Sequence, residues 1–252
     1  MTRAIRLEVD VPGTPEEVWA TVATGPGITS WFVPATVEER EAGAITMHFG
    51  EGMDETGTVT AWEPPRRFAY ATGAGTERAL EYEWLVEPGE AGESRVALIN
   101  SGFGEGPDWD RDYEGMAGGW PLFLENLRLV RANFPGEACA AAPVSAVVPG
   151  TPAEAYAAVL EALGAQPPAV GDEVWLAELG VNGRAERVGP ATVTLLLEQP
   201  APGIAFLAAE GSGSPAYVSV YGYFFGPEAE AVAEQAAARW SAWLVGRFPP
   251  EG

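Results

Sequence analysis

Apolar and polar residues alternate in several short stretches of the chain, and this pattern predicts β-strands. The first such stretch is Ile5–Val11. A helix is predicted directly after it, with Thr14 as the N-cap, Pro15 in the first turn and Glu17 completing a capping box. Glycines end this helix, and Ile28–Phe32 is expected to form a second short helical turn. The other strands predicted in this half are Ala44–Phe49, Gly57–Trp62, Arg67–Thr72, Leu80–Glu87 and Arg95–Ser101.

A longer helix is predicted from about Asp110 to Phe134, because apolar residues recur there at three- or four-residue steps. Gly118, Gly119 and Pro121 interrupt the pattern, so we expect a kink or a break at this point.

The chain contains an internal repeat. Val11–Val22 and Val148–Val159 share eight of twelve residues, which predicts two copies of one structural unit. We therefore expect one domain over residues 1–136 and a smaller, degenerate one over residues 143–252, joined by a linker at Gly136–Pro143. The elements predicted in the second copy are a strand at Pro143–Pro149, a helix at Pro152–Gly164, strands near Val174–Leu179, Thr192–Glu198, Ile204–Ala209 and Tyr217–Phe225, and a helix at Glu228–Arg247. This order indicates an α+β fold in which the last helix of each copy packs on one antiparallel sheet.

Charge narrows the range of partners. The 252 residues include 36 acidic residues and 14 basic ones, all arginine, for a formal net charge of −22. This field repels nucleic acid and anionic membrane surfaces, so we expect neither as a partner. The acidity favours solubility, and a salt-rich habitat is a second interpretation. Without lysine, the chain has neither a Schiff-base residue nor a P-loop lysine.

The sequence also predicts the cellular compartment of the protein and whether the chain spans a membrane. The single cysteine, Cys139, cannot form an internal disulfide. The N-terminal residues lack the apolar core of a signal peptide, and no 18-residue window is apolar enough for a membrane span. We expect a soluble cytoplasmic protein.

The first copy resembles the START / polyketide-cyclase helix-grip superfamily (SRPBCC), and specifically the branch named after the activator of the heat-shock protein 90 ATPase. The residues that carry this resemblance are Thr14–Trp19, Trp31, Gly57–Phe68, Gly118–Trp120 and Leu124–Leu127. The resemblance implies an antiparallel sheet wrapped around the C-terminal helix, with an apolar cavity between them. Members of the superfamily include lipid carriers, hormone receptors, cyclases and co-chaperones, so the family does not imply a single activity.

Alternation indicates which side chains line such a cavity. In Leu80–Glu87 the apolar residues share one face and the glutamates share the other. Asn100 is a polar residue on an otherwise apolar face; it either meets a ligand oxygen, bonds the backbone or lies at an exposed strand end. The candidate lining residues are Trp31, Tyr70, Tyr82, Trp84, Asn100, Phe103, Met116, Trp120 and Leu124.

Other possible sites have simpler explanations. The only histidine, His48, is predicted to point outward, which disfavours a catalytic triad. The acids of Asp108–Glu114 have the spacing of a calcium loop, but Tyr113 stands where that loop needs glycine. One cysteine and one histidine do not make an ordinary zinc site, and Gly102–Pro107 is not a dinucleotide fingerprint. Arg66 and Arg67 are interpreted as a solvated turn.

These observations favour a protein that binds an apolar or aromatic small molecule in its first domain, with the second domain covering or stabilising the first. The alternatives are an enzyme of the cyclase, aromatase or hydrolase kind that uses no metal or nucleotide cofactor, and a co-chaperone-like module that binds another protein. The sequence assigns no catalytic residue, no cofactor and no oligomeric state.

Overall fold

The computed structural model describes residues 3–50, 52–73, 75–211 and 213–249. The chain divides into two compact units, residues 1–137 and 138–252, and each is described here by itself. Among the described residues, no helix combines the length and the apolar character needed to cross a membrane.

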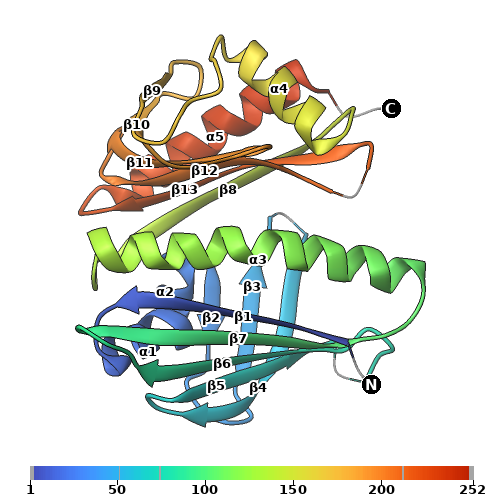
Figure 1. Ribbon diagram of the computed structural model, residues 1–252, viewed down its shortest axis with the longest axis vertical. Helices are drawn as coiled ribbons and strands as arrows, with labels where there is room; N and C mark the ends of the chain where they lie inside the picture. Colours follow the sequence, from blue (N-terminus) through green and yellow to red (C-terminus); the bar gives the residue numbers. More distant parts are fainter. Residues whose placement is uncertain (1–2, 51, 74, 212, 250–252) are drawn as a thin grey trace. The chain divides into compact units, whose positions relative to one another are not determined.

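The first unit is a seven-stranded antiparallel sheet with three helices (Figure 1). Its strands follow the order β1-β7-β6-β5-β4-β3-β2, so the first and the last strands of the unit are neighbours. The elements are β1 (Arg3–Pro12), α1 (Pro15–Ala23), α2 (Gly25–Thr29), β2 (Ala35–Val37), β3 (Ala44–His48), β4 (Asp54–Glu63), β5 (Arg67–Thr72), β6 (Leu80–Pro88), β7 (Glu93–Phe103) and α3 (Pro107–Asn133).

Helix α1 begins as its sequence predicts. The Thr14 backbone N–H donates to the Glu17 carboxylate at 2.9 Å, and the Glu17 backbone N–H donates to the Thr14 hydroxyl at 3.4 Å. This capping box satisfies backbone donors that have no partner inside the helix. The predicted start of α1 is confirmed.

The sheet buries one face, as alternation predicts. In β6, Leu80, Tyr82, Trp84 and Val86 are buried, while Glu81 lies exposed on the opposite face. The resulting apolar face of the sheet carries α3, whose Trp120 contacts both Tyr82 and Trp84.

Of the predicted kink or break in the last helix of this unit, the break does not occur. Helix α3 runs without interruption from Pro107 to Asn133, with Pro121 inside it (Figure 1). A proline in a helix removes one backbone hydrogen bond but leaves the surrounding turns intact when tertiary packing holds them. The packing that does so lies on the C-terminal side of Pro121, where Leu124 and Leu127 are buried.

The second unit repeats this plan with six strands in the order β8-β13-β12-β11-β10-β9. Its helix α4 has the same capping box, formed by Thr151 and Glu154. The long helix α5 packs on the sheet through Trp240, whose ring lies 6.0 Å from that of Phe224. The elements are β8 (Cys139–Val148), α4 (Pro152–Ala162), β9 (Glu173–Leu176), β10 (Val181–Gly189), β11 (Thr192–Gln199), β12 (Gly203–Glu210), β13 (Ala216–Phe225) and α5 (Ala229–Arg247).

Two strands were not predicted. Strand β2 spans only three residues, too few to show alternation. Strand β10 includes Arg184, Glu186 and Arg187, and a register shift between Ala185 and Arg187 disturbs its period of two. Both segments become strands because a neighbouring strand supplies hydrogen-bond partners, a long-range condition that a local pattern does not report.

The predicted linker is partly wrong. Residues 139–142 belong to β8, where Ala140, Ala141 and Ala142 pair with Phe224, Tyr223 and Gly222 of β13. Alanine has little strand propensity of its own, so this strand is decided by its pairing with the aromatic-rich β13.

Candidate ligand-binding site

Strands β5, β6 and β7 place a row of aromatic side chains on the buried face of the first sheet. Tyr70 pairs with Tyr82, and Tyr82 pairs with Asn100 on the next strand. Paired residues of antiparallel strands project from the same face, so these three side chains lie side by side. Trp84 lies on the same face, two residues after Tyr82.

The aromatic rings contact one another in a continuous series, which we call the aromatic row: Tyr70, Tyr82, Trp120, Trp84 and Trp31. The rings of Tyr70 and Tyr82 stack at 4.8 Å, and Trp120 meets Tyr82 at 6.1 Å. Trp84 then lies 5.7 Å from Trp120 and 5.3 Å from Trp31, in both cases edge to face. The structure therefore brings five of the nine predicted lining residues into one cluster between the sheet and α3.

Asn100 joins this cluster through hydrogen bonds. Its amide N–H donates to the backbone oxygen of Glu81 at 3.2 Å, and its side-chain oxygen accepts from the indole N–H of Trp120 at 3.3 Å. The residue is fully buried, so it does not lie at an exposed strand end. Of the three roles considered for Asn100, the structure shows the hydrogen bond to the backbone. The side-chain oxygen of Asn100 also orients the indole of Trp120.

The Tyr70 hydroxyl donates to a weak acceptor, whereas the Tyr82 hydroxyl has a hydrogen bond with Thr72. The Tyr70 hydroxyl donates to the sulfur of Met47 at 3.7 Å, and a thioether is a weak acceptor. Burial raises the pKa of Tyr70 well above its usual value, with Tyr82 and Glu55 adding to the shift and a hydrogen bond from Trp84 opposing it. Burial also raises the pKa of Tyr82. Both phenols are therefore neutral donors at ordinary pH.

The remaining predicted lining residues occupy other positions. Phe103 is buried against Trp109 and Tyr113 in the N-terminal part of α3, with ring distances of 6.2 and 5.1 Å. Met116 is half-buried, and Leu124 is buried. The structure thus places Phe103 under the N-terminal half of α3 rather than in the aromatic row.

Two neighbours of the row were not predicted as site residues. Phe32 packs against Trp120 at 5.1 Å, and only its position directly after Trp31 hinted at this. Asn126 is fully buried and donates to the backbone oxygen of Trp31 at 2.7 Å, while its own side-chain oxygen has no partner. The sequence signal that could have identified Asn126 is its polar side chain within an apolar stripe of the helix.

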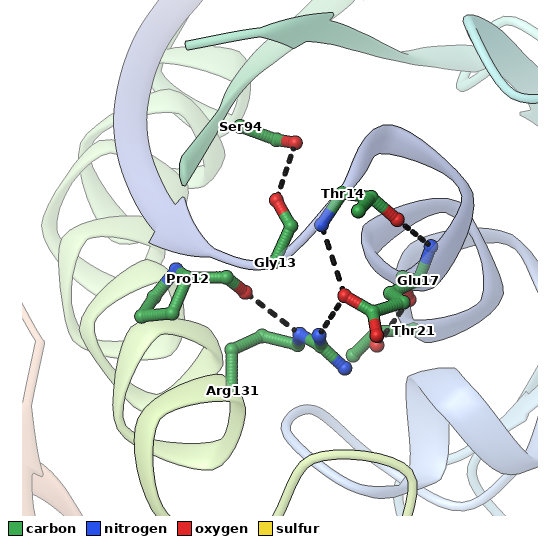
Figure 2. A network of polar contacts seen from close by, with 7 residues as sticks. All are labelled: Pro12, Gly13, Thr14, Glu17, Thr21, Ser94 and Arg131. Carbon is green, nitrogen blue, oxygen red and sulfur yellow. Dashed lines mark hydrogen bonds and ion pairs between the residues drawn. The ribbon is translucent and has the colours of Figure 1, made fainter. Parts of the chain in front are cut away.

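Arg131 fastens the C-terminal end of α3 to the turn between β1 and α1 (Figure 2). Its guanidinium donates to the Pro12 carbonyl at 3.1 Å and to the Glu17 carboxylate at 3.3 Å. Gly13 lies beneath it with a φ of +120°, and a Cβ there would collide with the guanidinium. The hydroxyl of Ser94 in β7 also donates a hydrogen bond to the Gly13 carbonyl at 2.8 Å, which ties the same turn to the sheet. We call this set of contacts the Arg131 clamp.

The other sequence candidates are explained by ordinary contacts. His48 is partly exposed and lies 2.9 Å from Asp54, which confirms that it points outward. Asp108 pairs with Arg111 within α3, and the other two aspartates of that stretch pair with arginines outside the helix. Among the described residues, no group of three or more His, Cys, Asp or Glu side chains is placed to hold a metal ion.

The last strand of the first unit leads into a long helix that packs on the buried face of its own sheet, and the second unit has the same order. This order is the helix-grip architecture that the sequence resemblance implies. Residues 12–130 match the family described as Activator of Hsp90 ATPase homolog 1-like protein.

Several solved structures are similar to about half of this chain or to nearly all of it. Protein MLL2253 from Mesorhizobium loti is 21% identical, with 51% of this chain and 96% of that chain covered and a TM-score of 0.46. The Aha1 dimer from Colwellia psychrerythraea is 16% identical, with coverage of 51% and 96% and a TM-score of 0.45. The di-domain ARO/CYC BexL from the BE-7585A biosynthetic pathway is 14% identical, with coverage of 99% and 100% and a TM-score of 0.47. No curated protein matches the sequence.

Proposed function

We propose that the first unit binds an apolar or aromatic small molecule that carries a hydrogen-bond acceptor, at the aromatic row between the sheet and α3. The observation that carries this proposal is the Tyr70 hydroxyl, which is 3% exposed and donates only to a thioether at 3.7 Å. A buried tyrosine hydroxyl ordinarily finds a strong acceptor. A ligand carbonyl or ether oxygen would supply one, while the surrounding rings would bury its apolar surface.

The state of the two tyrosines supports binding over proton transfer at these residues. Because burial raises the pKa of both Tyr70 and Tyr82, neither is poised to act as a base near neutral pH. Each hydroxyl keeps its proton and can orient a ligand by donating a hydrogen bond to it.

Two probes of matched shape test the proposal on the full chain. 2-Acetylnaphthalene carries a carbonyl acceptor, and 2-ethylnaphthalene lacks it. We expect both to bind, with the replacement Tyr70→Phe weakening the acetyl compound roughly tenfold, the equivalent of one good hydrogen bond. The ethyl compound should bind the variant as well as it binds the unchanged protein.

The matched control is Tyr156→Phe, which removes a buried hydroxyl of the second unit that has no hydrogen-bond partner. It should leave the affinity for both probes unchanged. Failure of either naphthalene to bind, or an equal loss of both in Tyr70→Phe, would show that Tyr70 does not orient a ligand and that the proposed function is wrong.

A further inference from the structure

The N-terminal and C-terminal halves of α3 are held in place by different kinds of contact. All eight buried residues of the helix lie at or beyond Trp120, and none lies between Pro107 and Gly119. The C-terminal half is also fixed by the hydrogen bond of Asn126 to Trp31 and by the Arg131 clamp (Figure 2). Apolar packing thus anchors the second half of α3.

The junction between the halves is weak. Pro121 has no N–H, so the carbonyl of Ala117 lacks its partner within the helix. Gly118 lies in the same turn, and glycine costs about 1 kcal/mol relative to alanine in a helix. A Cβ on Gly118 would meet nothing within 4 Å, so no close packing requires glycine there. The start of α3 is weak as well, because the N-cap Gly106 provides no side-chain hydrogen bond.

Two arginines from outside the helix hold the N-terminal half down. Arg3 of β1 pairs with Asp110 at 2.5 Å and lies 3.6 Å above the ring of Tyr113. Arg78, which precedes β6, pairs with Asp112 and lies 4.7 Å above the ring of Trp109. We call these contacts the arginine latch. Exposed ion pairs and cation–π contacts are weak and are screened by salt, in contrast to the buried packing of the second half.

The N-terminal half covers residues next to the proposed binding site. Trp109 and Tyr113 pack on Phe103, which is 3% exposed. Phe103 lies three residues after Asn100 at the end of β7, and Asn100 is bonded to Trp120 of the aromatic row. Release of this half would expose Phe103 and this end of the row.

From these observations we infer that residues 107–117 form a lid that regulates access to the site proposed above. The lid is closed by the arginine latch and opens by melting at the Gly118–Pro121 junction, while the Arg131 clamp holds the rest of α3 on the sheet. Opening means melting because isolated helices shorter than about 12 residues are marginal in water.

Amide hydrogen exchange of the full chain tests the lid without any ligand. We expect residues 107–117 to exchange through a separate, more frequent opening than residues 122–133. The double replacement Asp110→Asn and Asp112→Asn should speed exchange of 107–117 by roughly fivefold or more, and leave 122–133 unchanged. High salt should act in the same direction.

Matched variants separate the latch from general effects of charge and helix propensity. The double replacement Glu105→Gln and Glu114→Gln removes the same number of charges from this region but leaves the latch pairs and the Asp108–Arg111 pair intact, so exchange should change little. Gly118→Ala should slow opening roughly fivefold because it strengthens the junction. One common exchange rate for both halves, or equal effects of the two double variants, would overturn the lid.

Ligand binding is read separately with 2-acetylnaphthalene. The latch variant should raise its association rate by the same factor as the exchange rate. If exchange behaves as expected and the probe does not bind, the segment opens as inferred, but the proposed function and the control of access that rests on it are both wrong. If the probe binds at the same rate in every variant, the segment melts without controlling access, and the inference fails while the proposed function stands.

Discussion

The indole N–H of Trp120 donates a hydrogen bond to the side-chain oxygen of Asn100 at 3.3 Å, from the middle of α3 to the buried face of β7. Both residues are at least 95% buried. This bond sets the position of α3 along the sheet, because a buried amide oxygen without a donor would be costly. The same bond orients the indole that joins Tyr82 to Trp84.

Replacing Trp120 by phenylalanine should destabilise the first unit through this bond. The ring contacts would largely remain, but the Asn100 oxygen would lose its donor, at a cost of about 1–3 kcal/mol. Urea unfolding measures the change. Trp62→Phe is the control, since Trp62 contacts Trp19 and Phe68 through its ring. An equal loss in both variants would mean that the hydrogen bond contributes nothing.

Asn126 and Asn133 offer a matched pair on α3. Each donates to a backbone oxygen, at 2.7 and 2.9 Å, but Asn126 is buried and Asn133 is exposed. Asn126→Ala should lower the free energy of unfolding by about 1–3 kcal/mol, because the Trp31 carbonyl is left unpaired away from water. Asn133→Ala should change it by less than about 0.5 kcal/mol. Similar losses in chemical denaturation would contradict the role given to burial.

Replacing Arg131 by lysine should destabilise the first unit. A single ammonium cannot reproduce the fork that bonds both the Pro12 carbonyl and the Glu17 carboxylate, so Arg131→Lys should cost about 1–3 kcal/mol. The control is Arg95→Lys, an exposed pair with Asp10, which should change little. If thermal unfolding showed the two variants to be equally stable, the Arg131 clamp would not anchor the helix.

The tyrosines of the aromatic row predict a loss of stability in alkali. A raised pKa means that the folded state keeps protons that the unfolded state releases, so stability falls as the pH rises above the usual tyrosine value of 10.0. Below that pH these groups contribute no pH dependence. Tyr82→Phe should therefore flatten the decline measured by urea unfolding on either side of pH 10. Tyr217→Phe, at an exposed residue, is the control and should leave the decline unchanged.

The sequence by itself determined most of the helices and strands, and the face that β6 buries. The start of α1 at Thr14 depends on residues three positions apart, and the alternation in β6 depends on residues two apart. These signals depend on residues that are close together in the sequence, so they can be recognised without knowledge of the fold. The internal repeat likewise indicated two units of one architecture.

Only the tertiary structure decided which residues meet. Asn100 and Trp120 are 20 residues apart, and Arg131 is 119 residues from Pro12, so no periodicity could pair them. Phe103 packs on Trp109 and Tyr113 instead of joining the aromatic row. Phe32 packs on Trp120, and Asn126 bonds the backbone of Trp31. The uneven anchoring of α3 has the same origin, because apolar burial and buried hydrogen bonds depend on what the folded sheet presents to each turn of the helix.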